Sequence, residues 1–255
     1  MFGWVRLQFR EHRPDYAALL IARVAVSRTK VRLANKLLPP THECPCCGWT
    51  GRRFYDYIEV GYTAHNSACP QCDSHARHRA FHVWLREVYR IKDKKGVALV
   101  FAPEQALAPL WEEATQLKLI RVDIANARGV NVLANLENLP IRSDSMDLIW
   151  CHHVLEHVEH DVQAIGELQR VLHTRAGELI VSVPMEPGTV TDEYGFADPH
   201  MSGHWRMYGD DFVDRLAQSG LTVKECSHQL SPEQFRRFGI TPERFYICRK
   251  SSAAD

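Results

Sequence analysis

The stretch "DSMDLIWCHHVLEHVEHDVQAIGELQRVLHTRAGELIVSVP", residues 144–184, decides the fold class. Residues 146–153 and 177–184 are short runs rich in apolar side chains, which is typical of buried strands. Between them, residues 159–172 place apolar side chains at helical spacing. A strand, a helix and a second strand in this order predict a parallel sheet of the α/β class.

The same alternation extends in both directions along the chain. We expect strands at 96–101, 117–123, 221–227 and 243–250, and helices at 74–90, 104–116 and 210–220. Asp73 or Ser74 is expected to cap the first of these helices. Residues 74–255 are therefore predicted to form one α/β domain with a mostly parallel sheet.

Composition limits the possible partners and location. The chain has 255 residues, of which 45% are hydrophobic and 24% charged, and its net charge is zero. The neutral charge gives the whole molecule no electrostatic reason to seek nucleic acid. Arg6, Arg10 and Arg13 interrupt the early apolar runs, and no apolar run is long enough to span a bilayer. We therefore expect a cytoplasmic protein.

Residues 1–40 form a separate basic segment. They hold eight Lys or Arg residues against two acidic ones. Apolar residues at helical spacing predict a helix here, which Pro39 and Pro40 end; they are Leu20, Val24, Val31 and Leu38. A basic helix of this kind could lie on an anionic membrane, which would suit a peripheral contact.

Residues 41–73 carry two Cys-x-x-Cys pairs about twenty residues apart, the spacing of a four-cysteine zinc site. Cys46 competes for a place in this set, His65 is a further alternative, and four thiols without metal remain a separate interpretation. A closed four-thiolate site leaves zinc no open position, so the segment is predicted to be a ribbon with structural zinc. The predicted ligands are Cys44, Cys47, Cys69 and Cys72.

In an open parallel sheet, ligands bind outside the carboxyl ends of the strands. The first predicted strand runs into "LVFAPEQALAP", residues 99–109, where many nucleotide-binding folds have a glycine-rich turn and this chain has no glycine. Asp123 ends the second strand, where its carboxylate could accept hydrogen bonds from a ribose diol. A solvated loop acid is the alternative for Asp123.

Several further segments accompany these strands. Asp147, "HHVLEHV", "ELQRVL", Gly177 and "LIVSVP" follow one another in residues 147–183. In this order they resemble the class I S-adenosylmethionine-dependent methyltransferases. The cysteine pairs, "CPQCDSHARHR", "FAPE" and "HWRMYG" resemble a bacterial subgroup of that family, and the resemblance covers roughly residues 43–249. It implies a seven-stranded Rossmann-like sheet with helices on both faces.

The resemblance also implies cofactor-binding residues. Ala102 and Pro103 would let the backbone approach the methionine part of S-adenosylmethionine, and Glu104 would pair with its ammonium group, unless Glu104 is only a first-turn helix acid. Asp123 would bind the ribose. Asn135 stands where many relatives have an aspartate that accepts from the adenine amino group. The implied cofactor site comprises Phe101, Ala102, Pro103, Glu104, Asp123, Asn135, Leu136 and His152.

Methyl transfer from a sulfonium needs alignment, and a general base for a hydroxyl or amine acceptor. Residues 184–208 follow the fifth strand and are expected to cover the substrate. His204, Arg206 and Tyr208 alternate, so in an extended segment they share one face. His204 is the candidate base; Arg206 would bind a substrate carboxylate or phosphate, or pair with a nearby acid. The predicted catalytic residues are His204, His153 and Glu156, and the predicted substrate-binding residues are Arg206, Tyr208 and His157.

Two groups near the ribbon have weaker assignments. Arg77, His78 and Arg79 are expected to link the ribbon to the main domain or to contact an anion. His78 and His82 have helical metal-ligand spacing without an acidic third ligand, which argues against a second metal there.

Three functions follow from these features. The favoured one is a methyltransferase acting on a small molecule or glycan, with an oxygen acceptor preferred. The alternatives are an RNA or protein methyltransferase that docks its substrate on the ribbon and the basic segment, and an inactive zinc-binding scaffold. Nucleic acid is thus a possible but not favoured partner, and the sequence does not set the oligomeric state.

Overall fold

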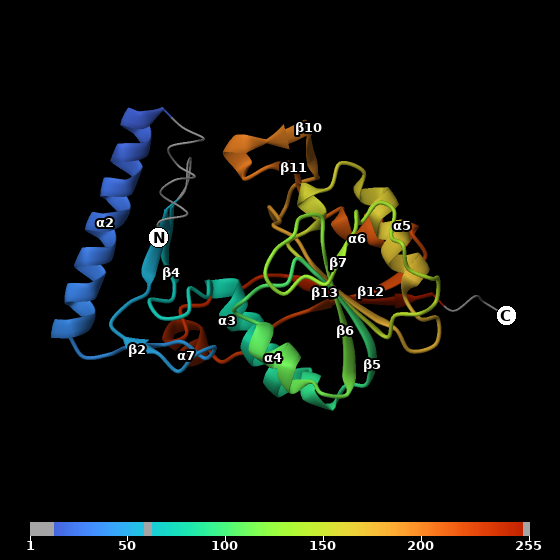
Figure 1. Cartoon of the computed structure of the whole chain (residues 1–255), viewed down its shortest axis with the longest axis horizontal. Helices are drawn as coiled ribbons and strands as arrows, with labels where there is room; N and C mark the ends of the chain where they lie inside the picture. The colour runs from blue at the N-terminus through green and yellow to red at the C-terminus, as the bar shows by residue number, and fades with distance from the viewer. Residues whose placement is uncertain (1–12, 59–62, 252–255) are drawn as a thin grey trace. The chain divides into compact units, whose positions relative to one another are not determined.

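The computed structural model describes residues 13–58 and 63–251 (Figure 1). The chain divides into two compact units, of which the first is Met1–Val83 with Gln229–Thr241 and the second is Trp84–His228 with Pro242–Asp255. This division differs from the predicted boundaries at 40, 73 and 74, because residues 74–83 and 229–241 pack with the ribbon. Arg6 and Arg10 lie outside the described residues.

The second unit is built on a seven-stranded sheet, which confirms the predicted α/β architecture. The strand order is β12-β13-β9-β8-β5-β6-β7. The five strands from β9 to β7 are parallel, whereas β13 runs antiparallel to both β9 and β12. The strands are β5 (Gly96–Phe101), β6 (Leu117–Asp123), β7 (Val132–Leu133), β8 (Leu148–His152), β9 (Glu178–Ser182), β12 (Leu221–Cys226) and β13 (Phe245–Lys250).

Helices cover both faces of this sheet (Figure 1). Alternate strand residues point to opposite faces. Leu99 of β5 and Ile149 of β8 belong to the core cluster that includes buried residues of α5 (Asp161–Val171) and α6 (Phe212–Gln218). On the other face, Trp150 meets Trp111 of α4 (Ala108–Glu113) edge to face, with ring centroids 5.7 Å apart. Burial of these apolar side chains is the main force that holds the layers together.

The helix expected at 104–116 is shorter than predicted. Residues 104–107 form a turn in which the Leu107 amide donates to the Glu104 carbonyl at 3.1 Å. A helix begun at Glu104 would need an amide hydrogen at Pro109, which proline lacks, so α4 begins only at Ala108. The helix expected at 74–90 is α3 (Ala76–Val83) followed by a wider π turn, η1 (Trp84–Val88), and it begins beyond both predicted caps.

The segment after β9 forms a hairpin. Strand β10 (Asp192–Asp198) pairs antiparallel with β11 (His204–Met207), and the 3-10 turn η4 (Pro199–Met201) lies between them. A second 3-10 turn, η3 (Leu155–His157), follows β8. The 3-10 turn η2 (Ile91–Asp93) precedes β5.

The first unit contains a long helix and two small hairpins. Helix α2 (Pro14–Leu37) confirms the helix predicted within residues 1–40, and its Val31 packs with Tyr55 and Ala68. Arg32 donates to the Tyr55 hydroxyl at 3.0 Å. Within the described part of the chain, no helix combines the length and apolar character needed to cross a membrane. The other elements are β1 (His42–Glu43), β2 (Thr50–Gly51), β3 (Tyr55–Ile58), β4 (Thr63–Ala68), α3 and α7 (Pro232–Arg237).

Candidate functional site

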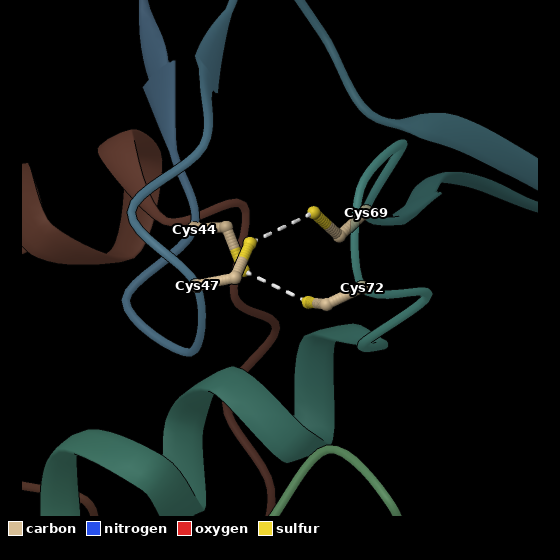
Figure 2. A group of neighbouring side chains, drawn as sticks. All are labelled: Cys44, Cys47, Cys69 and Cys72. Carbon is tan, nitrogen blue, oxygen red and sulfur yellow. Dashed lines mark hydrogen bonds between the residues drawn. The ribbon is translucent and has the colours of Figure 1, made fainter.

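Figure 2 shows the four predicted zinc ligands pointing toward one another from two facing loops. The Sγ atoms of Cys44 and Cys72 are 3.6 Å apart, and those of Cys47 and Cys69 are 3.7 Å apart. All four sulfur atoms lie within 4.8 Å of one another. Zinc bound tetrahedrally at about 2.3 Å from each sulfur needs separations of about 3.8 Å. The four cysteines therefore fit a structural zinc ion.

Each loop is shaped to present two thiols. The amides of Cys47 and Gly48 both donate to the Cys44 carbonyl, and Gly48 has a φ of 74°, which glycine adopts without strain. The Ser74 hydroxyl lies 3.1 Å from the Cys44 sulfur. Hydrogen bonds from neighbouring thiols and from Ser74 lower the pKa of Cys44, whereas burial and the neighbouring thiols raise those of Cys47 and Cys69.

The two competing ligands are not in this group. The four-sulfur group does not include Cys46. The Nδ1 atom of His65 lies 3.4 Å from the Asp56 carboxylate.

Arg79 is a buried cation beside this cluster. Its guanidinium donates to the carbonyls of Ser67, Ser74, Phe238 and Gly239 at 2.6 to 2.9 Å. Among the residues that the structure describes, no carboxylate forms an ion pair with Arg79. Burial lowers the pKa of Arg79, and the cysteine thiolates raise it. A zinc ion with four thiolates carries net negative charge, so the loaded cluster would balance this cation.

The sheet places the predicted cofactor residues at one edge. Strands β5 and β6 are paired up to Phe101 and Val122, so Ala102 and Asp123 both lie at their carboxyl ends. Ala102 has a φ of 43°, in the left-handed region that favours glycine, and its amide donates to the Val122 carbonyl at 2.9 Å. Such a backbone costs about 1 kcal/mol or more for alanine. The turn without glycine thus keeps a glycine-like backbone.

The other cofactor residues differ in accessibility. Asp123 is partly exposed and accepts from the Ala125 amide at 3.1 Å. Asn135 is exposed, and its amide group makes two hydrogen bonds to Glu137. Leu136 is only 5% exposed and packs in the core. These contacts leave Asp123 accessible to a ligand, whereas Leu136 offers at most its main chain.

Two histidines follow β8, next to β5. His152 is buried, its Nδ1 atom bonds the Ser182 hydroxyl, and its Nε2 atom lies 3.9 Å from Glu104. His153 bonds Glu243 at 2.5 Å and lies 3.4 Å from Glu156. Burial lowers the pKa of His153, but these two carboxylates outweigh it and raise the pKa to about 9. His153 is therefore protonated at neutral pH and is poorly suited to accept a proton.

The remaining predicted catalytic residues form a group with His157. Glu156, His157 and His204 each offer one ligand atom within 4.8 Å of the others. Glu156 is 1% exposed, whereas His157 is exposed. Burial lowers the pKa of His204, although Glu156 opposes this effect. A neutral His204 imidazole can accept a proton, as predicted for a base.

Arg206 and Tyr208 lie in the interior, where their polar groups already have protein partners. The Arg206 guanidinium donates to the carbonyls of Leu155, Val158 and Glu159 and to the Glu193 carboxylate. The Tyr208 hydroxyl donates to Asp161 at 2.9 Å. For Arg206, these contacts favour the alternative that the sequence left open, pairing with nearby acids; substrate binding by Arg206 and Tyr208 stays a prediction.

Sequence reasoning missed several acids that complete these contacts. Glu193 and Asp161 surround Arg206 and Arg215, and Glu243 holds His153. Asp161 and Glu243 lie more than forty residues from their partners along the chain, so no local pattern identifies them, and Glu193 meets Arg206 only because β10 and β11 pair.

A cavity of about 550 Å³ lies elsewhere, in the first unit between α2 and the β3–β4 hairpin. Its lining includes Arg28, Arg32 and Tyr55 and none of the predicted cofactor residues. This cavity is therefore not the cofactor site that the sequence predicts at the sheet edge.

We predict that zinc content depends on Cys47 and not on its neighbour Cys46. Wild-type protein and Cys46→Ser should each carry about one more zinc per chain than Cys47→Ser, because three thiolates no longer close the site. Elemental mass spectrometry of purified protein measures this. Equal zinc loss in both variants, or wild-type protein without zinc, would contradict the assignment.

Arg206→Met should lower the free energy of unfolding by about 3 kcal/mol, because it leaves buried Asp161 without one of its cations. Urea unfolding measures this change. Arg244→Met, which removes an exposed ion pair with Asp210, is the matched control and should have almost no effect. A fully stable Arg206→Met protein would favour the substrate-binding interpretation.

Residues 105–181 match the family described as "Methyltransferase domain". Over 62 residues the chain is 36% identical to an uncharacterized protein, MJ0638, of Methanocaldococcus jannaschii. That match covers 24% of the chain and 27% of the relative, so it spans little more than a quarter of the relative's length.

Two solved structures share the fold. One is a protein proposed to be a sarcosine dimethylglycine methyltransferase from Galdieria sulphuraria, with a TM-score of 0.52 and 16% identity over 69% of the chain and 86% of that structure. The other is the 4+2 cyclase SpnF, with a TM-score of 0.51 and 14% identity over 80% of the chain and 88% of that structure. Because one of them is a cyclase, the fold alone names no reaction. Residues 105–181 therefore match the methyltransferase-domain family, and the seven-stranded second unit shares the fold of these two structures.

Proposed function

We propose that the chain transfers the methyl group of S-adenosylmethionine to an oxygen atom of a small-molecule or glycan acceptor. One observation carries this proposal. The carboxyl ends of β5, β6 and β8 bring the strained Ala102 turn, the accessible Asp123 and the histidines after β8 to the edge where the strand order reverses. Ligands of open α/β sheets bind at such an edge.

Each cofactor group would meet a matching protein group. The backbone at Ala102 and Pro103 would pass close to the methionine part of the cofactor, because neither residue has a large side chain. Glu104, which is partly buried, would pair with the cofactor's ammonium group. Asp123 would accept hydrogen bonds from both ribose hydroxyls.

The reaction itself needs alignment and one proton acceptor. As the acceptor oxygen bonds to the methyl carbon, the bond from that carbon to the sulfonium breaks, and S-adenosylhomocysteine leaves with its sulfur uncharged. The acceptor's proton must be removed, and the neutral imidazole of His204 is suited to take it. His153, already protonated, would instead hold Glu156 and Glu243 in place.

We predict that the protein binds S-adenosylhomocysteine with roughly micromolar affinity. Asp123→Ala and Glu104→Gln should each weaken binding about tenfold or more, since each removes charge-assisted hydrogen bonds. Glu112→Gln, an exposed acid on nearby α4, is the control and should leave binding unchanged. Calorimetric titration of zinc-loaded protein measures all four affinities, and absence of wild-type binding would refute the proposal.

The acceptor class has its own test. Zinc-loaded protein is incubated with S-adenosylmethionine carrying a labelled methyl group, together with separate fractions of small molecules and glycans, RNA, and protein. We expect label in the first fraction, on an oxygen atom of the product as identified by mass spectrometry. Label in RNA or protein would contradict the proposed small-molecule or glycan acceptor but would support methyltransferase activity.

A further inference from the structure

We propose that Glu156, His157 and His204 form a second metal site, which binds a divalent transition-metal ion such as zinc or cobalt. The three residues come from two elements of the second unit, η3 and β11, and their ligand atoms lie within 4.8 Å of one another. Two imidazoles and one carboxylate are a ligand set that such ions prefer, and they leave coordination positions open.

The burial of Glu156 points independently to a cation. Its side chain is 1% exposed, and neither carboxylate oxygen has a hydrogen-bond partner among the described residues. The His153 ring lies beside it, with its Nδ1 atom 3.4 Å away, but that ring also pairs with Glu243. A buried carboxylate without hydrogen bonds is costly, so a bound cation would add to the partial compensation that His153 gives.

The two imidazoles also have a suitable arrangement. The rings of His157 and His204 are nearly perpendicular, at 85°, with centroids 4.7 Å apart. Two imidazoles bound to one tetrahedral ion at about 2.0 Å have centroids roughly 5 Å apart. The Nδ1 atom of His204 is buried and has no hydrogen-bond partner among the described residues. Exposed His157 can move by the small amount that ligation requires.

Arg206 holds the two elements together. It lies two residues after His204 on β11, and it donates to the Leu155 and Val158 carbonyls, which flank Glu156 and His157 in the chain. The Glu159 carbonyl is a third acceptor. Arg206 is thus a positioning residue for the site, and its contacts fix the two elements before any ion binds.

The neighbouring group of His152, His153 and Glu243 does not carry the same inference. His153 is bonded on one nitrogen to Glu243, and its other nitrogen faces Glu156. The His152 Nδ1 atom is bonded to Ser182. These hydrogen bonds already occupy most of the possible ligand atoms, whereas the Glu156 oxygens and the His204 Nδ1 atom have no hydrogen-bond partner among the described residues.

The role of the ion, unlike the site, rests on the proposed methyl transfer. An ion here would hold the acceptor oxygen and lower its pKa, so that its proton leaves to solvent as the oxygen attacks the methyl carbon. The His204 nitrogen that binds the ion cannot also take this proton. Metal-loaded enzyme would therefore use the ion in place of the His204 base.

Cobalt titration of protein whose cysteine site already holds zinc tests the site. Wild-type protein should bind one further equivalent of Co²⁺. Its visible spectrum should lack the sulfur-to-metal charge-transfer bands that cobalt shows in a cysteine site. Glu156→Gln and His204→Gln should each weaken this binding at least tenfold. His200→Gln, an exposed histidine of the same hairpin, is the matched control and should bind Co²⁺ like wild type.

Three results would overturn the site: no further equivalent in wild type, unchanged binding in Glu156→Gln and His204→Gln, or sulfur charge-transfer bands, which would mean exchange at the cysteines. Thermal unfolding without Co²⁺ confirms that the variants are folded. S-adenosylhomocysteine affinity is measured in parallel, so that failure of the proposed function and failure of the metal site give different results.

Discussion

The parallel pairing of β5, β6 and β8 is the constraint on which the proposed active site depends. Main-chain hydrogen bonds fix the register of these strands, so that Phe101 stands beside Val122 and Val100 beside Trp150. The chain therefore leaves all three strands at one edge. The Ala102 turn, Asp123 and His152 take their places from this register.

The register also explains why the turn after β5 can function without glycine. The Ala102 amide continues the β5–β6 hydrogen bonding by donating to Val122, and the backbone then turns through the left-handed region. Alanine adopts this conformation at a modest cost in conformational free energy. Its small side chain still leaves the backbone open to a ligand, which is the property that glycine supplies in other nucleotide-binding turns.

In the first unit, the apolar core around the ribbon is small, and charged groups would contribute much of the stabilisation. The buried cluster around the ribbon contains Cys44, Phe54 and Cys69, which is too little apolar area to hold four short strands. A zinc tetrathiolate would cross-link the two loops, and Arg79 would tie the cluster to the carbonyls of Phe238 and Gly239. Residues 229–241 belong to this unit for the same reason.

Local patterns in the sequence predict the elements well and the long-range contacts poorly. The strands at 96–101 and 117–123 have the predicted bounds, because their periodicity and flanking residues are local. Their spacing alone predicts that the four cysteines cluster, and the proximity of their sulfur atoms bears this out. The burial of Arg206 and Tyr208 could not be predicted, because alternation along β11 says which residues share a face and not whether that face meets solvent. Asp161, the partner of both, is more than forty residues away in the chain.

Hydrogen–deuterium exchange of zinc-loaded protein, with and without S-adenosylhomocysteine, tests the central claim most directly. If the edge formed by β5, β6 and β8 binds the cofactor, ligand should slow exchange of the amides at residues 101–107, 123–126 and 152–157 and leave those of α2 unchanged. Unchanged exchange at this edge, or protection confined to the first unit, would contradict the account.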